Sequence, residues 1–253
     1  SLFFTGLLLL TLVSFSDDVR PQHVAVRLFT HLAAMVLAFY QVSLFDWPLW
    51  LLAFSFIVSV GALSAFNFMD GINGITGVYA LVSLATFYII NNRVTHFVDN
   101  SLLATFGMSV LIFLFFNFRK KAMCFAGDVG SITIAYIQIF LLLELVVTTG
   151  NLWWVLLFLV YGIDTIATIL MRLGQRENIF RAHRKHLYQI LANEKSWDHR
   201  VVTIEAIGVP QVLINTVVVF SYLSNTFWGI VIVVFLYLMG YILARKRYAL
   251  VSW

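Results

Sequence analysis

The chain has 253 residues, of which 61% are hydrophobic and only 11% are charged. Its mean hydropathy of +0.93 means that its apolar surface exceeds what one soluble core could bury, which excludes an ordinary soluble domain. The net charge of +4 does not indicate nucleic-acid binding, because the basic residues flank apolar runs and are not interleaved with aromatic side chains. The composition predicts a membrane protein.

Long apolar runs in chain order predict an all-α polytopic membrane protein. A bilayer core about 30 Å thick needs roughly 20 apolar residues per helix, and continuous rather than alternating runs argue against a β-barrel. The predicted spans, nine in number, are 1–15, 24–43, 48–66, 75–91, 101–117, 132–149, 152–171, 206–224 and 226–244. The first run has neither a basic start nor a cleavage-like end, so we interpret it as a membrane helix rather than a signal peptide.

The basic residues gather on one side of the predicted membrane. Of the 16 lysines and arginines, only Arg93 falls on the opposite side, and Arg27 lies inside a span near the basic side. The positive-inside rule therefore makes the basic side cytoplasmic. The cytoplasmic loops are then 16–23, 67–74, 118–131 and 172–205.

Acidic motifs from three of these loops meet at the cytoplasmic face. They are the pair Asp17 and Asp18, Asp70 within the sequence NFMDGING, and Asp128 within GDVGS. If the helix ending near Phe66 continued for two more turns, Asn67, Asp70 and Asn73 would lie along one face. Carboxylate and amide oxygens are the ligands that Mg²⁺ prefers, and substrate phosphates commonly complete its shell. These motifs predict a metal–phosphate site.

The longest cytoplasmic loop supplies the opposite charge. Its candidate phosphate ligands are Arg181, Arg184, Lys185 and His186. One guanidinium group can donate to two phosphate oxygens at once, and histidine exchanges a proton near neutral pH. Arg27 could extend from its span to a lipid phosphate at the interface. A phosphorylated substrate is therefore expected at this face.

Each motif also has a purely structural interpretation. The Asp17 and Asp18 pair could be a solvated loop, and the segments 67–74 and 127–131 could be helix caps and turns. The basic loop could be a topogenic signal or a contact to anionic lipid. A structural role is expected for His31, and the roles of Glu144 and Asp164 stay open. The occurrence of all these motifs on one face favours the functional interpretation.

The order of these motifs, ending with His183–Gln189, resembles the polyprenyl-phosphate N-acetylhexosamine-1-phosphate transferases over essentially the whole chain. It is more similar to the branch that primes O-antigen, capsule or other surface-glycan synthesis than to the peptidoglycan branch. The resemblance implies one integral membrane domain over 1–253, in the bacterial inner membrane with its active site facing the cytoplasm. The intact protein would have ten or eleven helices, with about two N-terminal helices missing from this sequence.

The resemblance also implies the reaction, its cofactor and its partners. N-acetylhexosamine 1-phosphate would pass from a UDP-sugar to undecaprenyl phosphate with release of UMP, using Mg²⁺ or, in its place, Mn²⁺. Membrane lipid and a second copy of the chain are further expected partners. Single displacement and a two-step route through a covalent aspartate both stay open.

By motif match, the resemblance implies a role for each polar residue. The metal ligands would be Asp128 and Asn67, and the base would be Asp17 or Asp18. Asp70 and Asn73 would organise the nucleotide-sugar pocket, and Arg27 would face the lipid phosphate. Arg184 and His186 would hold the diphosphate, and Arg181 stays a candidate substrate ligand from the basic loop.

Two departures and two rival functions bear on this interpretation. The loop reads His186-Leu187-Tyr188-Gln189 where many relatives end in H-x-H-H, and Asn73 stands where many carry Asp, which leaves the donor sugar open. A transporter or flippase could use Asp164, Glu144 and His31 within the membrane, but its polar groups should lie at the midplane rather than at helix ends. A non-catalytic scaffold that binds nucleotide-sugar is the other rival.

Overall fold

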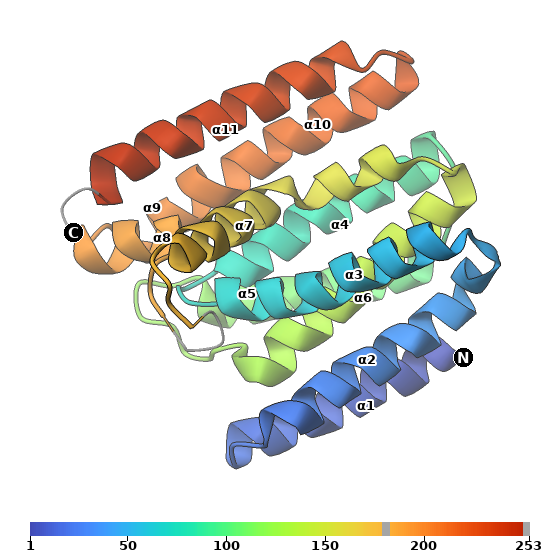
Figure 1. Ribbon diagram of the computed structural model, residues 1–253, viewed down its shortest axis with the longest axis horizontal. Coiled ribbons are helices and arrows are strands. Elements are labelled where there is room, and N and C mark those ends of the chain that lie inside the picture. Colours follow the sequence, from blue (N-terminus) through green and yellow to red (C-terminus); the bar gives the residue numbers. More distant parts are fainter. Residues whose placement is uncertain (179–182, 250–253) are drawn as a thin grey trace.

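The computed structural model describes residues 1–178 and 183–249. The described part is helical and without strands, and nine of its helices are long and apolar enough to cross a membrane. The predicted all-α polytopic fold is therefore confirmed. Figure 1 shows the arrangement.

The membrane-spanning elements follow the predicted runs closely. The first six are α1 (Leu2–Val19), α2 (Val24–Gln41), α3 (Leu49–Met69), α4 (Ile75–Arg93), α5 (Asn100–Asn117) and α6 (Gly127–Thr149). The last three are η2 (Leu152–Phe158) with α7 (Leu159–Gly174), then α9 (His199–Val202), η4 (Thr203–Gly208) and α10 (Val209–Leu223) in one span, then α11 (Trp228–Ala249). The short elements are η1 (Leu44–Asp46), α8 (Leu187–Gln189) and η3 (Ile190–Glu194).

Helix α6 forms the centre of the bundle, where it packs against α1, α3 and α4. Within its apolar window 78% of the residues are buried in the protein, against 11% in α11. A helix that is apolar all round needs either protein or lipid on every side. The exposed side chains of Leu8, Leu12 and Phe15 lie along one face of α1, and this face suits contact with lipid tails.

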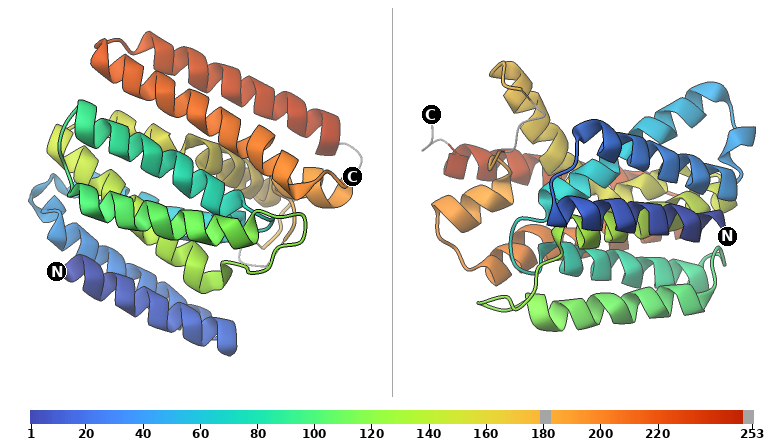
Figure 2. Two further views of the ribbon diagram at one scale, coloured as in Figure 1. Left: turned by 180° about the vertical axis from the view of Figure 1, so that it is seen from behind. Right: turned by 90° about the horizontal axis from the view of Figure 1, so that it is seen from below.

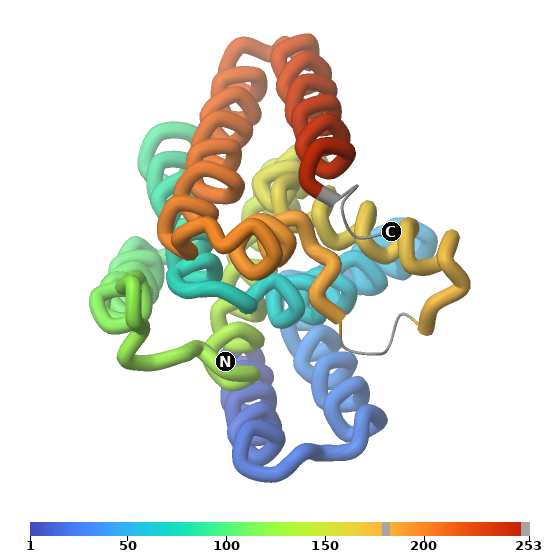
Figure 3. Tube along the Cα trace, turned by 90° about the vertical axis from the view of Figure 1, so that its left-hand side faces the viewer, coloured from blue at the N-terminus to red at the C-terminus, as the bar shows by residue number. Residues whose placement is uncertain are grey.

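Two helical hairpins flank the central helices. The α1–α2 pair lies on one side and the α10–α11 pair on the other, with α3, α4, α6 and α7 between them (Figures 1 and 2). Segments 20–23, 70–74, 118–126 and 183–198 gather at one end of the bundle, which Figure 3 views end on. We call this end the loop end, and it carries the polar motifs.

Two sequence-based expectations about local structure are wrong. Asp17 and Asp18 lie in the last turn of α1, and Asp128 lies in the first turn of α6, rather than in loops. Polar residues end an apolar run but do not prevent helical backbone at a helix terminus. Helix α3 also stops at Met69, so Asn67, Asp70 and Asn73 do not share a helical face. The chain leaves the helix at Asp70 (φ −83°, ψ 70°) and turns again at Gly74, whose φ is +85°.

Candidate active site

An arginine from α2 joins two aspartates from different helices at the loop end. One guanidinium nitrogen of Arg27 lies 3.3 Å from Asp17 Oδ2 in α1, and the other lies 3.3 Å from Asp128 Oδ2 in α6. Both carboxylates therefore lie against the same guanidinium group. Together with Asp18, these residues form what we call the carboxylate cluster.

Asp18 has a different role from its neighbour Asp17. Its carboxylate accepts hydrogen bonds from the backbone N–H groups of Asp128 (3.1 Å) and Val129 (3.2 Å). These N–H groups belong to the positive end of α6, where an anion is stabilising. Gly127 has a φ of +61°, and a Cβ there would lie 2.7 Å from Asp18 Oδ2, so glycine is favoured at this position. Asp18 thus fixes the start of α6, while Asp17 faces Asp128.

The carboxylate cluster has the donor set of a Mg²⁺ site. Ser131 Oγ in the first turns of α6 donates to Asn67 Oδ1 at 2.9 Å, which holds the Asn67 amide beside the start of α6. Two carboxylates in contact repel each other unless a proton or cation lies between them, and Arg27 offsets only one of three negative charges. Among the described residues no group of three His, Cys, Asp or Glu could hold a metal, so substrate phosphate and water would have to complete the shell.

Asp70 follows the last residue of α3 at the loop end and is half-buried. Thr76 Oγ1 donates to Asp70 Oδ1 at 2.6 Å. Burial raises the pKa of Asp70 to about 6, the negative charge of Asp128 adds to this rise, and the hydrogen bond from Thr76 opposes it. Asp70 can therefore change its charge close to neutral pH.

Asn73 is held in a separate set of contacts. Its Nδ2 donates to the carbonyl of Arg119 at 2.8 Å, and its own carbonyl accepts from Thr203 Oγ1 at 3.0 Å. The next residue, Gly74, donates its N–H to Asn117 Oδ1 at 2.6 Å. These bonds tie the loop after α3 to the segment after α5, and in the described structure they occupy the Asn73 side chain.

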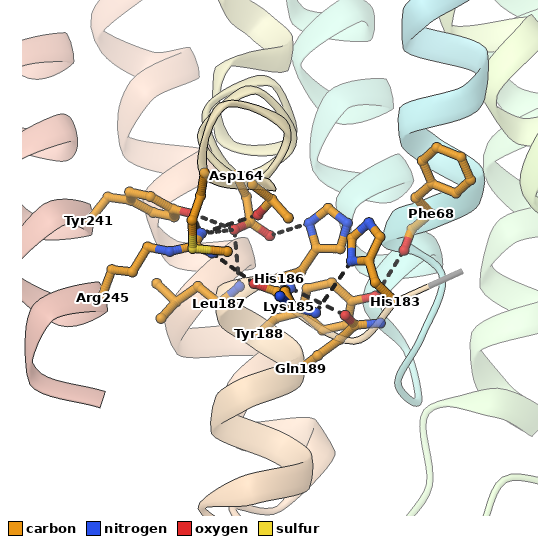
Figure 4. Close-up of polar contacts among 12 residues, drawn as sticks. Phe68, Asp164, His183, Lys185, His186, Leu187, Tyr188, Gln189, Tyr241 and Arg245 are labelled. Carbon is orange, nitrogen blue, oxygen red and sulfur yellow. Dashed lines mark hydrogen bonds and ion pairs between the residues drawn. The ribbon is translucent and has the colours of Figure 1, made fainter. Parts of the chain in front are cut away.

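The predicted phosphate ligands of the long loop are found in different places. Arg181 lies outside the described residues, and Arg184 is exposed to solvent. His186 is buried, and its Nδ1 lies 3.1 Å from Asp164 Oδ2 in α7 (Figure 4). We call Asp164, His186, Tyr241 and Arg245 the histidine cluster. The structure thus brings Asp17, Asp18 and Arg27 together with Asp128 and places His186 in a second cluster.

Several contacts at the site could not be found from the sequence. Tyr188 Oη donates to the carbonyl of Phe68 at 3.0 Å, and a Cβ on Gly71 would lie 2.4 Å from the same oxygen. The sequence does not indicate that the hydroxyls of Thr76 and Ser131 contact site residues, because threonine and serine are common near helix starts. Asp164 could be recognised from the sequence as a candidate, since a lone acidic residue in an apolar span is a functional candidate by default.

The fold and the carboxylate cluster together define a polytopic membrane protein with an acidic, arginine-bridged site at its helix ends. The model of glycosyl transferase family 4 matches residues 1–146, which include Asp17, Asp70 and Asp128. The chain belongs to this family.

Curated relatives carry two kinds of name. The phospho-N-acetylmuramoyl-pentapeptide-transferase of Thermotoga petrophila is 35% identical over 122 residues, covering 48% of this chain and 38% of the relative. The protein of the same name from Thermotoga neapolitana is 28% identical over 223 residues, 79% of this chain and 72% of the relative. The probable undecaprenyl-phosphate N-acetylglucosaminyl 1-phosphate transferase of Bacillus subtilis is 29% identical over 154 residues, 59% of this chain and 43% of the relative.

These matches bear on the predictions unequally. The predicted family is confirmed, and nothing supports the transporter alternative. The chain spans 38% of the length of the Thermotoga petrophila relative, and the relatives include names from the peptidoglycan branch as well as from the other branch. The predicted surface-glycan branch and the donor sugar therefore stay predictions.

Proposed function

We propose that this protein transfers N-acetylhexosamine 1-phosphate from a UDP-sugar to undecaprenyl phosphate on the cytoplasmic side of a bacterial inner membrane. Family membership supports the class of reaction. The observation that carries the proposal is the pairing of Arg27 with both Asp17 and Asp128, at 3.3 Å each. Such a site attracts a divalent cation and phosphate together, because its hard oxygens and its guanidinium lie side by side.

The position of the carboxylate cluster suits a phosphate carried by a lipid. A small pocket between α1, α2 and α6 has charged residues at the loop end and apolar residues toward the membrane interior. It is lined by Leu10, Val13, Ser14, Asp17, Arg27, Thr30, His31, Asp128 and Ile132. The pocket itself, of about 10 Å³, has room for little more than one water, so the lipid phosphate would lie at its mouth. Arg27 would bind it there, since its side chain is one-third exposed (33%) and can reach the interface.

In the proposed reaction, an oxygen of the lipid phosphate attacks the phosphorus next to the sugar. The bond to UMP breaks, and UMP leaves with the electron pair. Asp17 orients the attacking phosphate and accepts its proton where one is present, because its Oδ2 lies 3.3 Å from Arg27, the proposed ligand of that phosphate. Asp128 and Asn67 would hold Mg²⁺, which when bound would neutralise the diphosphate charge.

The donor would lie over the loop end. Asp70 would line the nucleotide-sugar pocket, and Arg184, Arg181 and His186 would contact the diphosphate. Most of the rate enhancement would come from positioning and charge neutralisation. The branch that primes O-antigen, capsule or another surface glycan is the proposed pathway, with a homodimer as the proposed assembly.

UMP release tests the proposal directly. Purified protein would be given undecaprenyl phosphate, Mg²⁺ and a panel of UDP-N-acetylhexosamines, alongside the variants Asp128→Asn and Glu144→Gln. We expect release that requires both lipid and Mg²⁺ and falls roughly 10²- to 10³-fold in Asp128→Asn. Glu144→Gln is the matched control, because it removes an acidic charge from the same helix outside the site. A folded protein that releases no UMP with any donor would refute the proposal.

A further inference from the structure

The histidine cluster is a buried polar network that the proposed reaction does not use in full. Asp164 Oδ2 lies 3.1 Å from His186 Nδ1, while Oδ1 accepts from the Leu187 N–H at 3.0 Å and from Tyr241 Oη at 2.6 Å (Figure 4). The Asp164 side chain is only 4% exposed. A carboxylate buried this deeply needs all its acceptor sites filled, and this one receives three donors.

Helix α11 supplies the outer part of this network. Tyr241 and Arg245 lie one turn apart and so project from the same face of a helix that is otherwise mostly exposed. Arg245 Nη1 lies 3.8 Å from Asp164 Oδ1 and 3.1 Å from Thr168 Oγ1, and Nη2 donates to the Lys185 carbonyl at 2.9 Å. Arg245 therefore neutralises Asp164 and also fastens the backbone just before His186.

These contacts determine which nitrogen of His186 is free. Because Asp164 Oδ2 is an acceptor with its partner oxygen already occupied, the hydrogen between the two side chains belongs to Nδ1. The other nitrogen, Nε2, is buried without a hydrogen-bond partner among residues 1–178 and 183–249. An unpartnered buried ring nitrogen is unfavourable unless something else binds to it.

Tyr188 joins the His186 ring to the segment that carries Asn67 and Asp70. It stacks on the ring of Tyr188 with centroids 5.8 Å apart, and Tyr188 Oη donates to the Phe68 carbonyl at 3.0 Å. The close approach of Tyr188 to Gly71 holds the two segments together. The histidine cluster is thus joined to the loop end by direct contacts.

We propose that Asp164, Tyr241 and Arg245 are positioning residues that hold His186 with Nδ1–H toward Asp164 and Nε2 toward the diphosphate of the nucleotide-sugar. This inference rests on the proposed function. It gives a role to Asp164 and to the loop end of α11, which family membership and the motifs leave without one. With Nδ1–H held on Asp164, Nε2 donates to a phosphate oxygen once it is protonated, and the Asp164 carboxylate balances the charge of the imidazolium without any reorientation of the ring.

The first test is the protonation state of the ring. Nitrogen NMR of protein labelled with ¹⁵N-histidine, with His186→Gln as the variant that assigns the signal, should show a hydrogen on Nδ1 of His186. In Asp164→Asn the amide oxygen would stay with Leu187 and Tyr241, which turns the amide NH₂ toward Nδ1. The hydrogen should then move to Nε2. A wild-type His186 with bare Nδ1 would overturn the proposal, and this spectrum requires no folded Asp164 variant.

The second test separates positioning from general loss of structure. We expect Asp164→Asn to lower kcat for UMP release by about 10- to 100-fold, and Asp164→Asn with His186→Ala to lose no more than His186→Ala alone. Glu144→Gln, the same kind of change in another span, should leave kcat unchanged. Losses that multiply in the double variant would overturn the proposal. If wild-type protein releases no UMP, the proposed function fails, and the NMR spectrum still decides how Asp164 holds the ring.

Discussion

Two clusters at the loop end both pair aspartate with arginine, yet they are built in opposite ways. In the carboxylate cluster, Arg27 is 33% exposed and Asp128 is 25% exposed. In the histidine cluster, Arg245 is 14% exposed and Asp164 only 4%. Asp164 accepts three hydrogen bonds at its two oxygens, whereas Asp17 accepts one, from the Gln22 N–H at 2.6 Å, and shares the guanidinium of Arg27 with Asp128.

We therefore interpret the carboxylate cluster as a ligand-binding site and the histidine cluster as a network that positions one side chain. Like charges in contact are unfavourable by themselves and become favourable when a cation or a phosphate–cation pair joins them. In the histidine cluster, Nε2 of His186 is the one buried polar side-chain atom without a hydrogen-bond partner among the described residues. A ligand could therefore bind to this cluster through that nitrogen. Substitutions in the carboxylate cluster should therefore reduce activity more than stability. The adjacent residues Asp17 and Asp18 allow the sharpest test of this expectation.

The largest expected effect is that of Asp17→Asn on UMP release. The amide keeps the shape of the side chain but removes the charge that faces Asp128, so we expect a fall of roughly 10²- to 10³-fold. The melting temperature should change little, because the lost ion pair with the partly exposed Arg27 contributes no more than about 1 kcal/mol.

Asp18→Ala should show the reverse pattern, and it is the matched control for Asp17. Its carboxylate accepts two N–H groups at the start of α6, and losing such a cap costs about 0.5–2 kcal/mol. We expect a lower melting temperature with a smaller loss of kcat than in Asp17→Asn. If Asp18→Ala abolishes turnover at full stability, the assignment of the base to Asp17 is wrong.

A smaller effect is expected from changes to the arginine that joins the two aspartates. Arg27→Gln should raise KM for undecaprenyl phosphate about 100-fold, and Arg27→Lys about tenfold, since an ammonium group keeps the charge but loses the two-pronged geometry. Steady-state kinetics at fixed donor concentration would measure both. Equal KM values in wild type and Arg27→Gln would show that Arg27 serves only to neutralise the aspartates.

The sequence predicted the membrane spans well because a run of about 20 apolar residues has the length that a helix needs to cross a bilayer. It also brought Asp17, Asp18, Asp70 and Asp128 to one face, since helices of one bundle alternate in direction. It could not show that α3 stops at Met69, which depends on backbone dihedral angles rather than polarity. Nor could it pair Asp164 with His186, because that pair depends on how α7, α11 and the long loop pack together.

The smallest predicted effect concerns the charge of Asp70. Its pKa of about 6 lies above the ordinary value, so the fold favours the neutral carboxyl. The resulting stabilisation is complete below the ordinary pKa and is lost as pH rises through about 6. If the ionised carboxylate is the form that assists the donor sugar, activity should rise over the same interval.

Substitution of Thr76 should shift the pH range over which Asp70 ionises. Its hydroxyl donates to Asp70 Oδ1 at 2.6 Å and favours the charged form. Thr76→Val should therefore raise the pKa of Asp70 by roughly one unit and move the acidic limb of the activity profile upward by the same amount. Thr76→Ser keeps the donor and should keep the wild-type limb. UMP release measured from about pH 5 to pH 8 would reveal the shift, and superimposed profiles for all three proteins would mean that the charge of Asp70 does not control turnover.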